Sequence, residues 1–289
     1  MNEIPHVMAA TGSELRQERK AIGTDMEEDK KYYQIGSLEK GVKILEAIIE
    51  NGELTVSGTA ALMGMNRASA HRFINTLKDL GYVRKNQHNK YEATFKMLEY
   101  GMKQADNFEI RRLAKPYLRK ISSTFEETVN LGILDRDKIV YLDKVESLEL
   151  LRMDTGVGTS CQAYVSALGK AILAFLPDEE LKTYLDGLVM AEALTPNTIT
   201  TIEKLEKNLA KVRRLGYAVD NEELSTGLFC VGVPVFDFNG YPTYAISVSG
   251  LVARVKKLKK QNQLSEKLIE CAAKLSRQLG HRKVQPGLK

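Results

Sequence analysis

Polar and basic side chains recur at helical spacing just after position 65, and they suit contact with nucleic acid. The group comprises Asn66, Arg67, Ser69, His71, Arg72 and Asn75. An arginine can pair with a guanine edge through two hydrogen bonds, and a serine can contact a base or a phosphate. Arg67, Ser69 and Arg72 fall at the start of the predicted helix, the end that meets base edges in a helix-turn-helix protein. We therefore expect these residues to read DNA.

A second basic group follows on two strand-like stretches around a turn at 86–89. Its members are Arg84, Lys85, His88 and Lys90. We expect them to contact phosphates, which supplies affinity and register but no sequence preference. Residues 66–90 carry six basic side chains and one acidic one, whereas residues 97–251 carry seventeen and twenty-two. This contrast is typical of a phosphate-binding module joined to a regulatory domain. An ordinary solvated helix face is the alternative, and the basic segment 252–289 is not assigned to DNA.

Three helices and a hairpin must position these side chains. The first helix begins near Ser37 and carries an apolar stripe of Leu38, Val42, Leu45 and Ile49. The second runs from Thr55 to Met63, and the third from Arg67 to Leu80 with Asn66 as its N-cap. Two helices joined by a short turn and followed by a hairpin at 82–94 predict a winged helix-turn-helix. A three-helix bundle used for protein contacts remains the alternative.

The rest of the chain mixes helices with antiparallel strands and predicts an α+β fold. A long amphipathic helix is expected at 107–125, one helix at 163–176 and a final helix at 252–280. We expect the following divisions: a mobile extension at 1–34, a DNA-binding domain at 35–94, a linker helix at 95–108, a regulatory domain at 109–281 and a tail at 282–289.

Composition and motifs narrow the class of protein. The 289 residues are 43% hydrophobic and 27% charged, with no run of about 18 apolar residues that would span a membrane. The N-terminus has no apolar signal core, so we expect a cytoplasmic protein. Three scattered cysteines predict neither a disulfide nor a zinc framework. The usual catalytic motifs and nucleotide-binding loops are missing, and we expect no cofactor.

Three stretches of this chain resemble the IclR family of bacterial transcription regulators. They are MNRASAHRFINTLKDLGYV from Met65, SALGKAILA from Ser166, and RRLGYAVDNEELSTGLFCVGVPVFDFNGYPTYAISVSG from Arg213. The resemblance covers roughly 35–280. The segments NLGILD and KIVYLDKVES favour the branch that includes the repressor of 2-keto-3-deoxygluconate catabolism.

The resemblance implies a winged helix-turn-helix, a linker helix and a GAF-like effector-binding domain. It also implies homodimers, which can pair into tetramers, on palindromic operators in double-stranded DNA, controlled by small carboxylates or aromatic acids. Matched position by position, the effector site would contain Leu150, Met153, Ala167, Leu168, Asp220, Cys230, Ser247 and Ser249. Tyr164 departs from the family pattern, because relatives often have a histidine there.

The chemistry of those residues suits an organic acid. Ser247 and Ser249 are two apart on a predicted strand, so their hydroxyls point to one face. Together with backbone amides near Gly169 at a helix start they can hold a carboxylate without a cation. Asp220 would repel an acid group, so we expect it to accept from a ligand hydroxyl or hydrate. The alternatives are a solvent-facing strand for the serines and simple packing for Cys230.

We therefore expect a ligand-responsive repressor of a catabolic operon that senses a small keto acid or sugar acid. A small-molecule enzyme with an N-terminal helical protein-interaction unit is the alternative, and an activator would use the same parts as a repressor.

Overall fold

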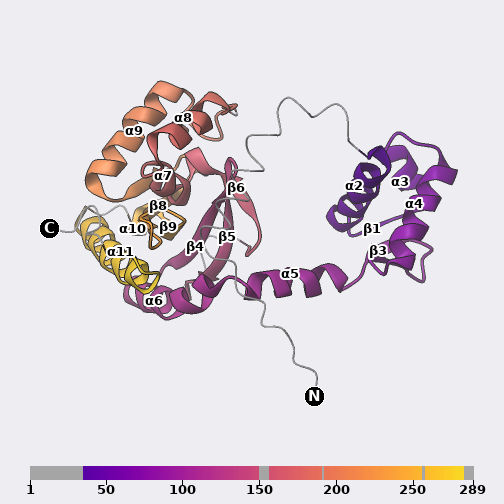
Figure 1. Cartoon of the computed structure of the whole chain (residues 1–289), viewed down its shortest axis with the longest axis horizontal. Helices are drawn as coiled ribbons and strands as arrows, with labels where there is room; N and C mark the ends of the chain where they lie inside the picture. Colours follow the sequence, from indigo (N-terminus) through magenta and orange to yellow (C-terminus); the bar gives the residue numbers. More distant parts are fainter. Residues whose placement is uncertain (1–34, 150–155, 191, 256–257, 283–289) are drawn as a thin grey trace, which may run out of the picture. The chain divides into compact units, whose positions relative to one another are not determined.

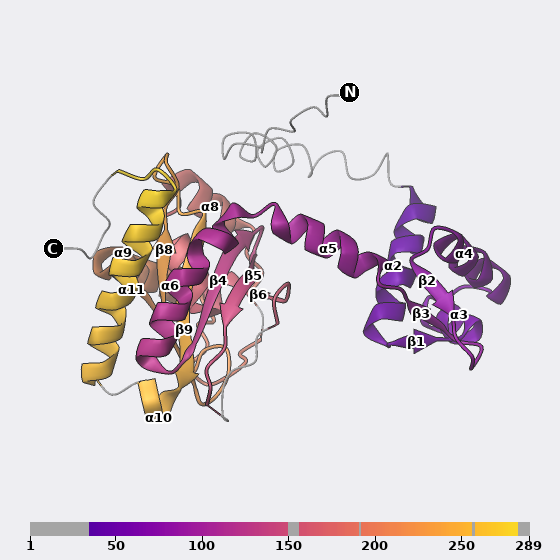
Figure 2. The same ribbon diagram turned by 90° about the horizontal axis from the view of Figure 1, so that it is seen from below.

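The computed structural model describes residues 35–149, 156–190, 192–255 and 258–282. The chain divides into two compact units, Met1–Asn107 and Phe108–Lys289, each shown in Figures 1 and 2. The expected extension at 1–34 and nearly all of the expected tail lie outside the described residues.

The N-terminal unit contains three helices and a small antiparallel sheet. The helices are α2 (Gly36–Glu50), α3 (Val56–Leu62) and α4 (Arg67–Asp79), and the strands β1 (Glu53–Leu54), β2 (Val83–Lys85) and β3 (Tyr91–Ala93) pair in the order β1-β3-β2. Two predicted caps are confirmed: the Thr55 side chain accepts a hydrogen bond from the Gly58 amide, and Asn66 accepts one from the Ser69 amide. The four residues 63–66 join α3 to α4, and the hairpin β2–β3 is the wing.

The core of this unit uses a different face of α2 from the apolar stripe seen in the sequence. Ile44 and Ile48 are buried against α4 and the wing. Leu38 and Val42 of the stripe remain largely exposed. Leu80, expected on the buried side of the third helix, is also exposed, because α4 ends before it at Asp79. Amphipathic spacing therefore located the helices but misplaced part of the buried face.

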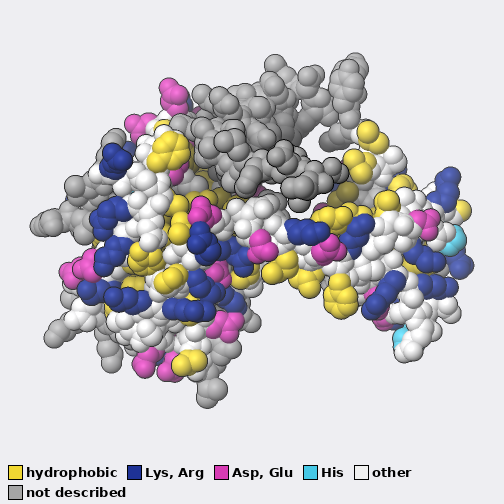
Figure 3. Space-filling view, turned by 60° about the horizontal axis from the view of Figure 1, so that its bottom comes forward, with side chains coloured by type: hydrophobic (Ala, Val, Ile, Leu, Met, Phe, Trp, Pro, Cys, Tyr) yellow, Lys and Arg dark blue, Asp and Glu magenta, His cyan; other side chains and the backbone are white. Residues whose placement is uncertain are grey.

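Helix α5 (Lys96–Asp106) follows the wing and buries none of its residues. Its large apolar side chains are on the surface, and Figure 3 shows hydrophobic groups gathered along it. The exposed set comprises Phe95, Met97, Leu98, Tyr100 and Met102. Large exposed apolar patches are typical of interaction sites.

The C-terminal unit is built on a six-stranded antiparallel sheet in the order β6-β5-β4-β9-β8-β7. The strands are β4 (Thr128–Asp135), β5 (Lys138–Val145), β6 (Ser160–Gln162), β7 (Ala218–Asn221), β8 (Leu228–Val235) and β9 (Tyr244–Leu251). The predicted α+β class is confirmed.

Helices cover both faces of this sheet. Helices α6 (Glu109–Phe125) and α11 (Leu258–Gln278) pack on one face and α7 (Ala167–Leu173) and α9 (Ile202–Leu215) on the other, in two separate apolar clusters. Helices α8 (Asp178–Asp186) and α10 (Val252–Val255) complete the unit. Figure 2 shows α6 and α11 side by side on their face.

One predicted helix is interrupted in the structure. The segment expected as one helix from 163 is a short 3-10 turn, η1 (Ala163–Val165), followed by α7. The break occurs because Ser166 is extended and its hydroxyl accepts a hydrogen bond from the Gly169 amide, which starts a new helix. The last predicted helix, 252–280, is represented by α10 and α11, and residues 256–257 between them lie outside the described residues.

Candidate functional site

The polar residues of α4 lie at its start and along its solvent side. Arg67, His71 and Arg72 are exposed. A guanidinium nitrogen of Arg72 is 3.5 Å from the Ser69 hydroxyl, and the Asn75 amide nitrogen is 3.4 Å from His71 Nε2. Asn66 is occupied by capping the helix at 2.8 Å from the Ser69 amide. Arg67 therefore makes no hydrogen bond with another described side chain, whereas Arg72 and His71 would have to give up long contacts within the helix to reach a ligand.

The basic side chains of the wing are not equally available. Arg84 Nε lies 2.7 Å from Glu92, and Lys90 Nζ lies 2.6 Å from Glu53. Lys85 is exposed and makes no ion pair with any described residue. Figure 3 shows Lys and Arg side chains gathered on the surface of this unit. We expect Lys85 to carry more of any phosphate contact than its paired neighbours, since both partners of a pair are already neutralised.

A row of polar side chains crosses the sheet of the C-terminal unit under α7. Asp220 on β7 is the register partner of Cys230 on β8, which in turn is the partner of Ser249 on β9. Two positions along, Gly232 is the partner of Ser247. Because side chains alternate between the two faces along each strand, this row lies on one face of the sheet. Val231 and Val248 lie on the other face, in the core beneath α6 and α11. Strand pairing thus brings together residues up to 29 positions apart.

Helix α7 closes this row from above. A Cβ at Gly232 would come within 2.5 Å of the Ala167 carbonyl oxygen, so the absence of a side chain there lets the helix start rest on the strand. The enclosed cavity is small, about 10 Å³, which is room for about one water molecule. Its walls are formed by Tyr141, Ser166, Ala167, Leu168, Asp220, Leu224, Leu228, Cys230, Ser247 and Ser249.

Six of the eight expected effector-site residues line this cavity. Leu150 and Met153 lie outside the described residues. Ser247 and Ser249 are only 2% and 6% exposed, so the alternative of a solvent-facing strand is wrong. Tyr141, Ser166, Leu224 and Leu228 were missed from sequence. The capping position of Ser166 could have been found from its spacing to Gly169, whereas Tyr141 required the strand register.

The carboxylate of Asp220 dominates the electrostatics of the cavity. Its Oδ1 accepts hydrogen bonds from the amides of Glu223 at 2.7 Å and Leu224 at 3.4 Å. Its Oδ2 is buried and has no hydrogen-bond partner among the residues that the structure describes. Burial raises the pKa of Asp220 to about 6, against the opposing effect of the backbone amide of Glu223 and the charge of Lys170. An acceptor is thus left available at the cavity.

Two other groups at the cavity are the Cys230 thiol, which was expected to be a wall residue, and the Gly169 amide. Burial raises the pKa of the Cys230 thiol well above its usual value, so this sulfur stays protonated and forms part of the wall. The Gly169 amide, expected to hold a carboxylate, already donates to the Ser166 hydroxyl at 2.9 Å. The amides of Ala167 and Leu168 precede it in the first turn, where helix N–H groups lack intrahelical partners.

A larger surface hollow of about 450 Å³ lies beside α8 and α9. Its basic side chain Arg213 is engaged with the Ala174 carbonyl at 2.6 Å and with Asp178 at 3.2 Å. The hollow contains none of the polar row, so we place the candidate site in the smaller cavity. Within the described ranges no cluster of three His, Cys, Asp or Glu side chains is arranged to hold a metal ion, and no described helix is long and apolar enough to cross a membrane.

Comparison with known families accounts for both units. Residues 37–87 match the IclR helix-turn-helix domain, and residues 102–277 match the C-terminal domain of the bacterial transcriptional regulator IclR. The chain belongs to the IclR family. Being an IclR-family protein, it is a ligand-responsive DNA-binding transcriptional regulator, and the enzyme alternative is set aside.

Named relatives of this IclR-family protein cover most of its length. It is 35% identical over 254 residues to the HTH-type transcriptional regulator KdgR of Escherichia coli, spanning 88% of this chain and 96% of that protein. It is also 35% identical to KdgR of Dickeya chrysanthemi, of which it covers 83%. The crystal structure of the Thermotoga maritima IclR superposes with a TM-score of 0.72 at 39% identity, covering 86% of this chain and 100% of that one. The resemblance to the 2-keto-3-deoxygluconate repressor branch is confirmed.

Proposed function

We propose that this regulator is a cytoplasmic repressor of a catabolic operon that reads a palindromic operator and releases it when a small keto acid or sugar acid binds. The observation that carries the effector assignment is the buried row Asp220–Cys230–Ser249 with Ser247, closed by α7. We assign DNA reading to residues 35–94, linkage to 95–108 and effector binding to 109–281.

For DNA reading we assign base contacts to Arg67, Ser69 and Arg72, which lie at or near the start of α4. His71 and Asn75 follow on the same helix, and Asn66 supports the helix start as its cap. Arg84, Lys85 and Lys90 of the wing contact phosphates, with Lys85 the least encumbered. A helix start enters the major groove because its side chains project beyond the backbone toward base edges.

For effector binding we assign the acid group to the hydroxyls of Ser247 and Ser249 and to the amides at the start of α7. Asp220 Oδ2 accepts from a hydroxyl or hydrated carbonyl of the effector. Leu228 and the Cys230 thiol form an apolar wall beside them. Because the cavity is small, a bound effector displaces part of its wall. The effector therefore binds one conformation of the protein more tightly than the other, and this difference in binding free energy shifts the equilibrium between the DNA-binding and the released state.

For assembly we propose a homodimer, which can pair further into a tetramer. The exposed apolar side chains of α5, together with Leu38 and Val42 of α2, all belong to the N-terminal unit. A second copy of this unit would cover them. Two reading helices related by a two-fold axis then meet half-sites about 34 Å apart or a multiple of that spacing.

Arg72→Ala should weaken operator binding by about 1–3 kcal/mol and relax preference at one base pair in each half-site, because one bidentate base contact is lost. Lys85→Ala should instead weaken binding to all DNA sequences equally. It should also reduce the salt dependence of binding by about one released counterion per protomer. Fluorescence anisotropy on an operator-like palindrome at several salt concentrations measures both. Arg119→Ala, an exposed arginine on α6, is the control. Unchanged affinity and preference for Arg72→Ala would contradict the recognition-helix assignment.

A thermal-shift screen of small keto, hydroxy and aromatic acids should identify the effector class. An acid at a hundredfold excess over its Kd stabilises the protein by about 2.7 kcal/mol. Ser249→Ala should reduce that stabilisation, because it removes a hydroxyl buried at the cavity. Ser123→Ala, which changes an exposed hydroxyl on α6, should leave it intact. An equal shift in both variants would remove Ser249 from the effector site.

A further inference from the structure

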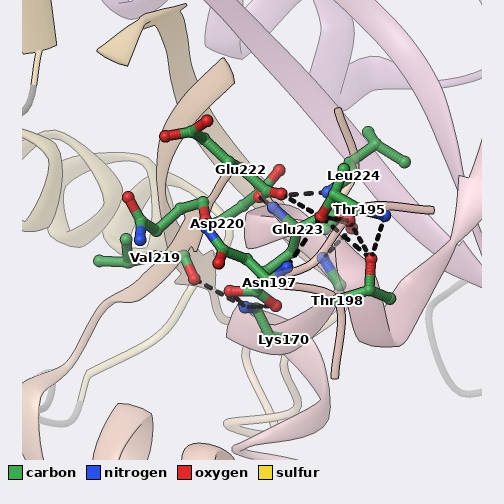
Figure 4. A network of polar contacts seen from close by, with 12 residues as sticks. Lys170, Thr195, Asn197, Thr198, Val219, Asp220, Glu222, Glu223 and Leu224 are labelled. Carbon is green, nitrogen blue, oxygen red and sulfur yellow. Dashed lines mark hydrogen bonds and ion pairs between the residues drawn. The ribbon is translucent and has the colours of Figure 1, made fainter. Parts of the chain in front are cut away.

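An ion pair lies just behind the effector cavity without lining it. The Lys170 side chain is fully buried, and its Nζ is 2.6 Å from Glu223 Oε1 and 2.6 Å from the Val219 carbonyl oxygen. Glu223 is 7% exposed. Lys170 lies on α7 one turn after the Ser166 cap, whereas Glu223 follows β7. The pair therefore ties the helix that closes the cavity to the loop that follows Asp220, as Figure 4 shows.

The loop after Asp220 is held from its other side by two threonines. Thr195 Oγ1 donates to the Glu222 carbonyl, and Thr198 Oγ1 donates to the Glu223 carbonyl at 2.7 Å. Figure 4 shows these hydroxyls and the Lys170 ammonium reaching the same short segment. Its backbone carbonyls are thus engaged by the threonines, and its acidic side chain by the lysine.

Asp220 depends on this loop for its own orientation. Its Oδ1 is held by the amides of Glu223 and Leu224, which leaves Oδ2 as the oxygen with no partner in the described part of the chain. A loop that moved would release both amides and allow the carboxylate to turn. The geometry of the acceptor at the cavity therefore follows from the placement of Glu223.

The charges of the pair act on Asp220 in opposite directions. Burial gives the largest upward contribution to the pKa of Asp220, while Lys170 lowers that pKa and Glu223 raises it. Within the described ranges, the Tyr141 phenol and the thiols of Cys161 and Cys230 are further titratable groups that interact with this carboxyl. Burial raises the pKa of all three, so they are neutral at pH 7 and leave the balance to Lys170 and Glu223.

A contribution to fold stability is by itself a weak explanation for a buried ion pair. The desolvation of two buried charges offsets most of their attraction, and apolar replacements of similar volume are often neutral or stabilising. A role in setting the geometry and charge of Asp220 is a specific alternative with its own measurable consequences.

We propose that Lys170 and Glu223 are a positioning pair for the effector cavity: Lys170 favours the ionised form of Asp220, and Glu223 holds the loop whose amides leave Oδ2 presented as an acceptor. The cavity then selects acids that also carry a hydrogen-bond donor, such as a hydroxyl or a hydrated carbonyl, over acids without one. This inference rests on the proposed effector site, and it adds the residues that determine which acids fit.

The test titrates Asp220 in the full-length protein by ¹³C NMR with labelled aspartate, the signal being assigned from its loss in Asp220→Asn. Lys170→Met should raise the pKa of Asp220 above the wild-type value, because a cation is removed, whereas Glu223→Gln should lower it, because an anion is removed. Opposite changes support the proposal, since lost packing alone gives no such reversal of sign. Changes of the same sign, or none in either variant, overturn it.

A double variant keeps the test open if Lys170→Met fails to fold. Lys170→Met/Glu223→Leu leaves no buried unpaired charge. We expect the amides of Glu223 and Leu224 to exchange with solvent at least tenfold faster in it, with exchange at Val248 in the core unchanged. Wild-type protection of both loop amides in a folded double variant would overturn the proposal. These measurements use neither DNA nor an effector, so they stand apart from the operator-binding and thermal-shift tests of the proposed function.

Discussion

Gly169→Ala should destabilise the C-terminal unit by roughly 3 kcal/mol or more and abolish the effector response, because the new methyl group has no room. A Cβ at this position would lie 2.1 Å from the Ala163 carbonyl oxygen and 2.5 Å from two further backbone atoms of that residue. Backbone atoms cannot rotate away as a side chain can, so η1 and the start of α7 must separate. Urea unfolding followed by circular dichroism measures the loss.

The matched control is Gly187→Ala at the end of α8. There a Cβ would lie 3.5 Å from the Thr183 carbonyl oxygen, an ordinary contact, and φ is −89°. We expect a change of less than about 1 kcal/mol, because no backbone group has to move. Equal stability of the two variants would contradict the prediction, because it would show that the backbone of η1 can move away from α7 at little cost in free energy.

Asp220→Asn should make the protein more stable at pH 7.5, by about 2–3 kcal/mol, while weakening the effector response. The pKa of Asp220 is raised from 3.8 in the unfolded chain to about 6 in the folded one, so the folded state binds its proton more tightly. Stability from this group is therefore lost as the pH rises from 3.8 through 6, and a tenfold difference in proton affinity corresponds to about 1.4 kcal/mol. The neutral amide of asparagine removes the free-energy cost of an ionised carboxylate in the folded protein. Replacement of a functional charge often stabilises a protein in this way.

Urea unfolding of wild type and Asp220→Asn from about pH 3.5 to 8 checks the sign. The difference in the free energy of unfolding should be largest above about pH 6 and should shrink toward zero near pH 4, where the native carboxyl is protonated. Asp186→Asn provides a control, since this aspartate is exposed at the end of α8 in the same unit. A wild type that is more stable than Asp220→Asn at pH 7.5 would contradict an ionised carboxylate held in an unfavourable environment.

The exposed apolar surface of the N-terminal unit shows why spacing alone misplaced part of the core. The stripe of Leu38, Val42, Leu45 and Ile49 has the right period for a helix, and the helix is there. Periodicity cannot tell whether a stripe faces its own core or a partner, because the chemistry of both surfaces is the same. The face that meets α4 contains Ile44 and Ile48 instead.

Local features of the sequence determined the reading helix and its turn. Thr55 and Asn66 cap their helices through contacts three residues away, and the basic residues follow on the same helix. Such short-range hydrogen bonds need no tertiary context, so residue type and spacing were enough to predict them. The family resemblance, confirmed over both units, identified six residues that line the candidate cavity.

Only the tertiary structure decided how that cavity is built. Register across β7, β8 and β9 aligns Asp220, Cys230 and Ser249, and no local pattern encodes a register between distant strands. The ion pair joins Lys170 to Glu223 across 53 residues of sequence. In the sequence alone, each of these residues has the type and spacing of an ordinary surface charge. Their burial follows from packing α7 on the sheet, a non-local event that forces the two charges to pair because neither can stay solvated.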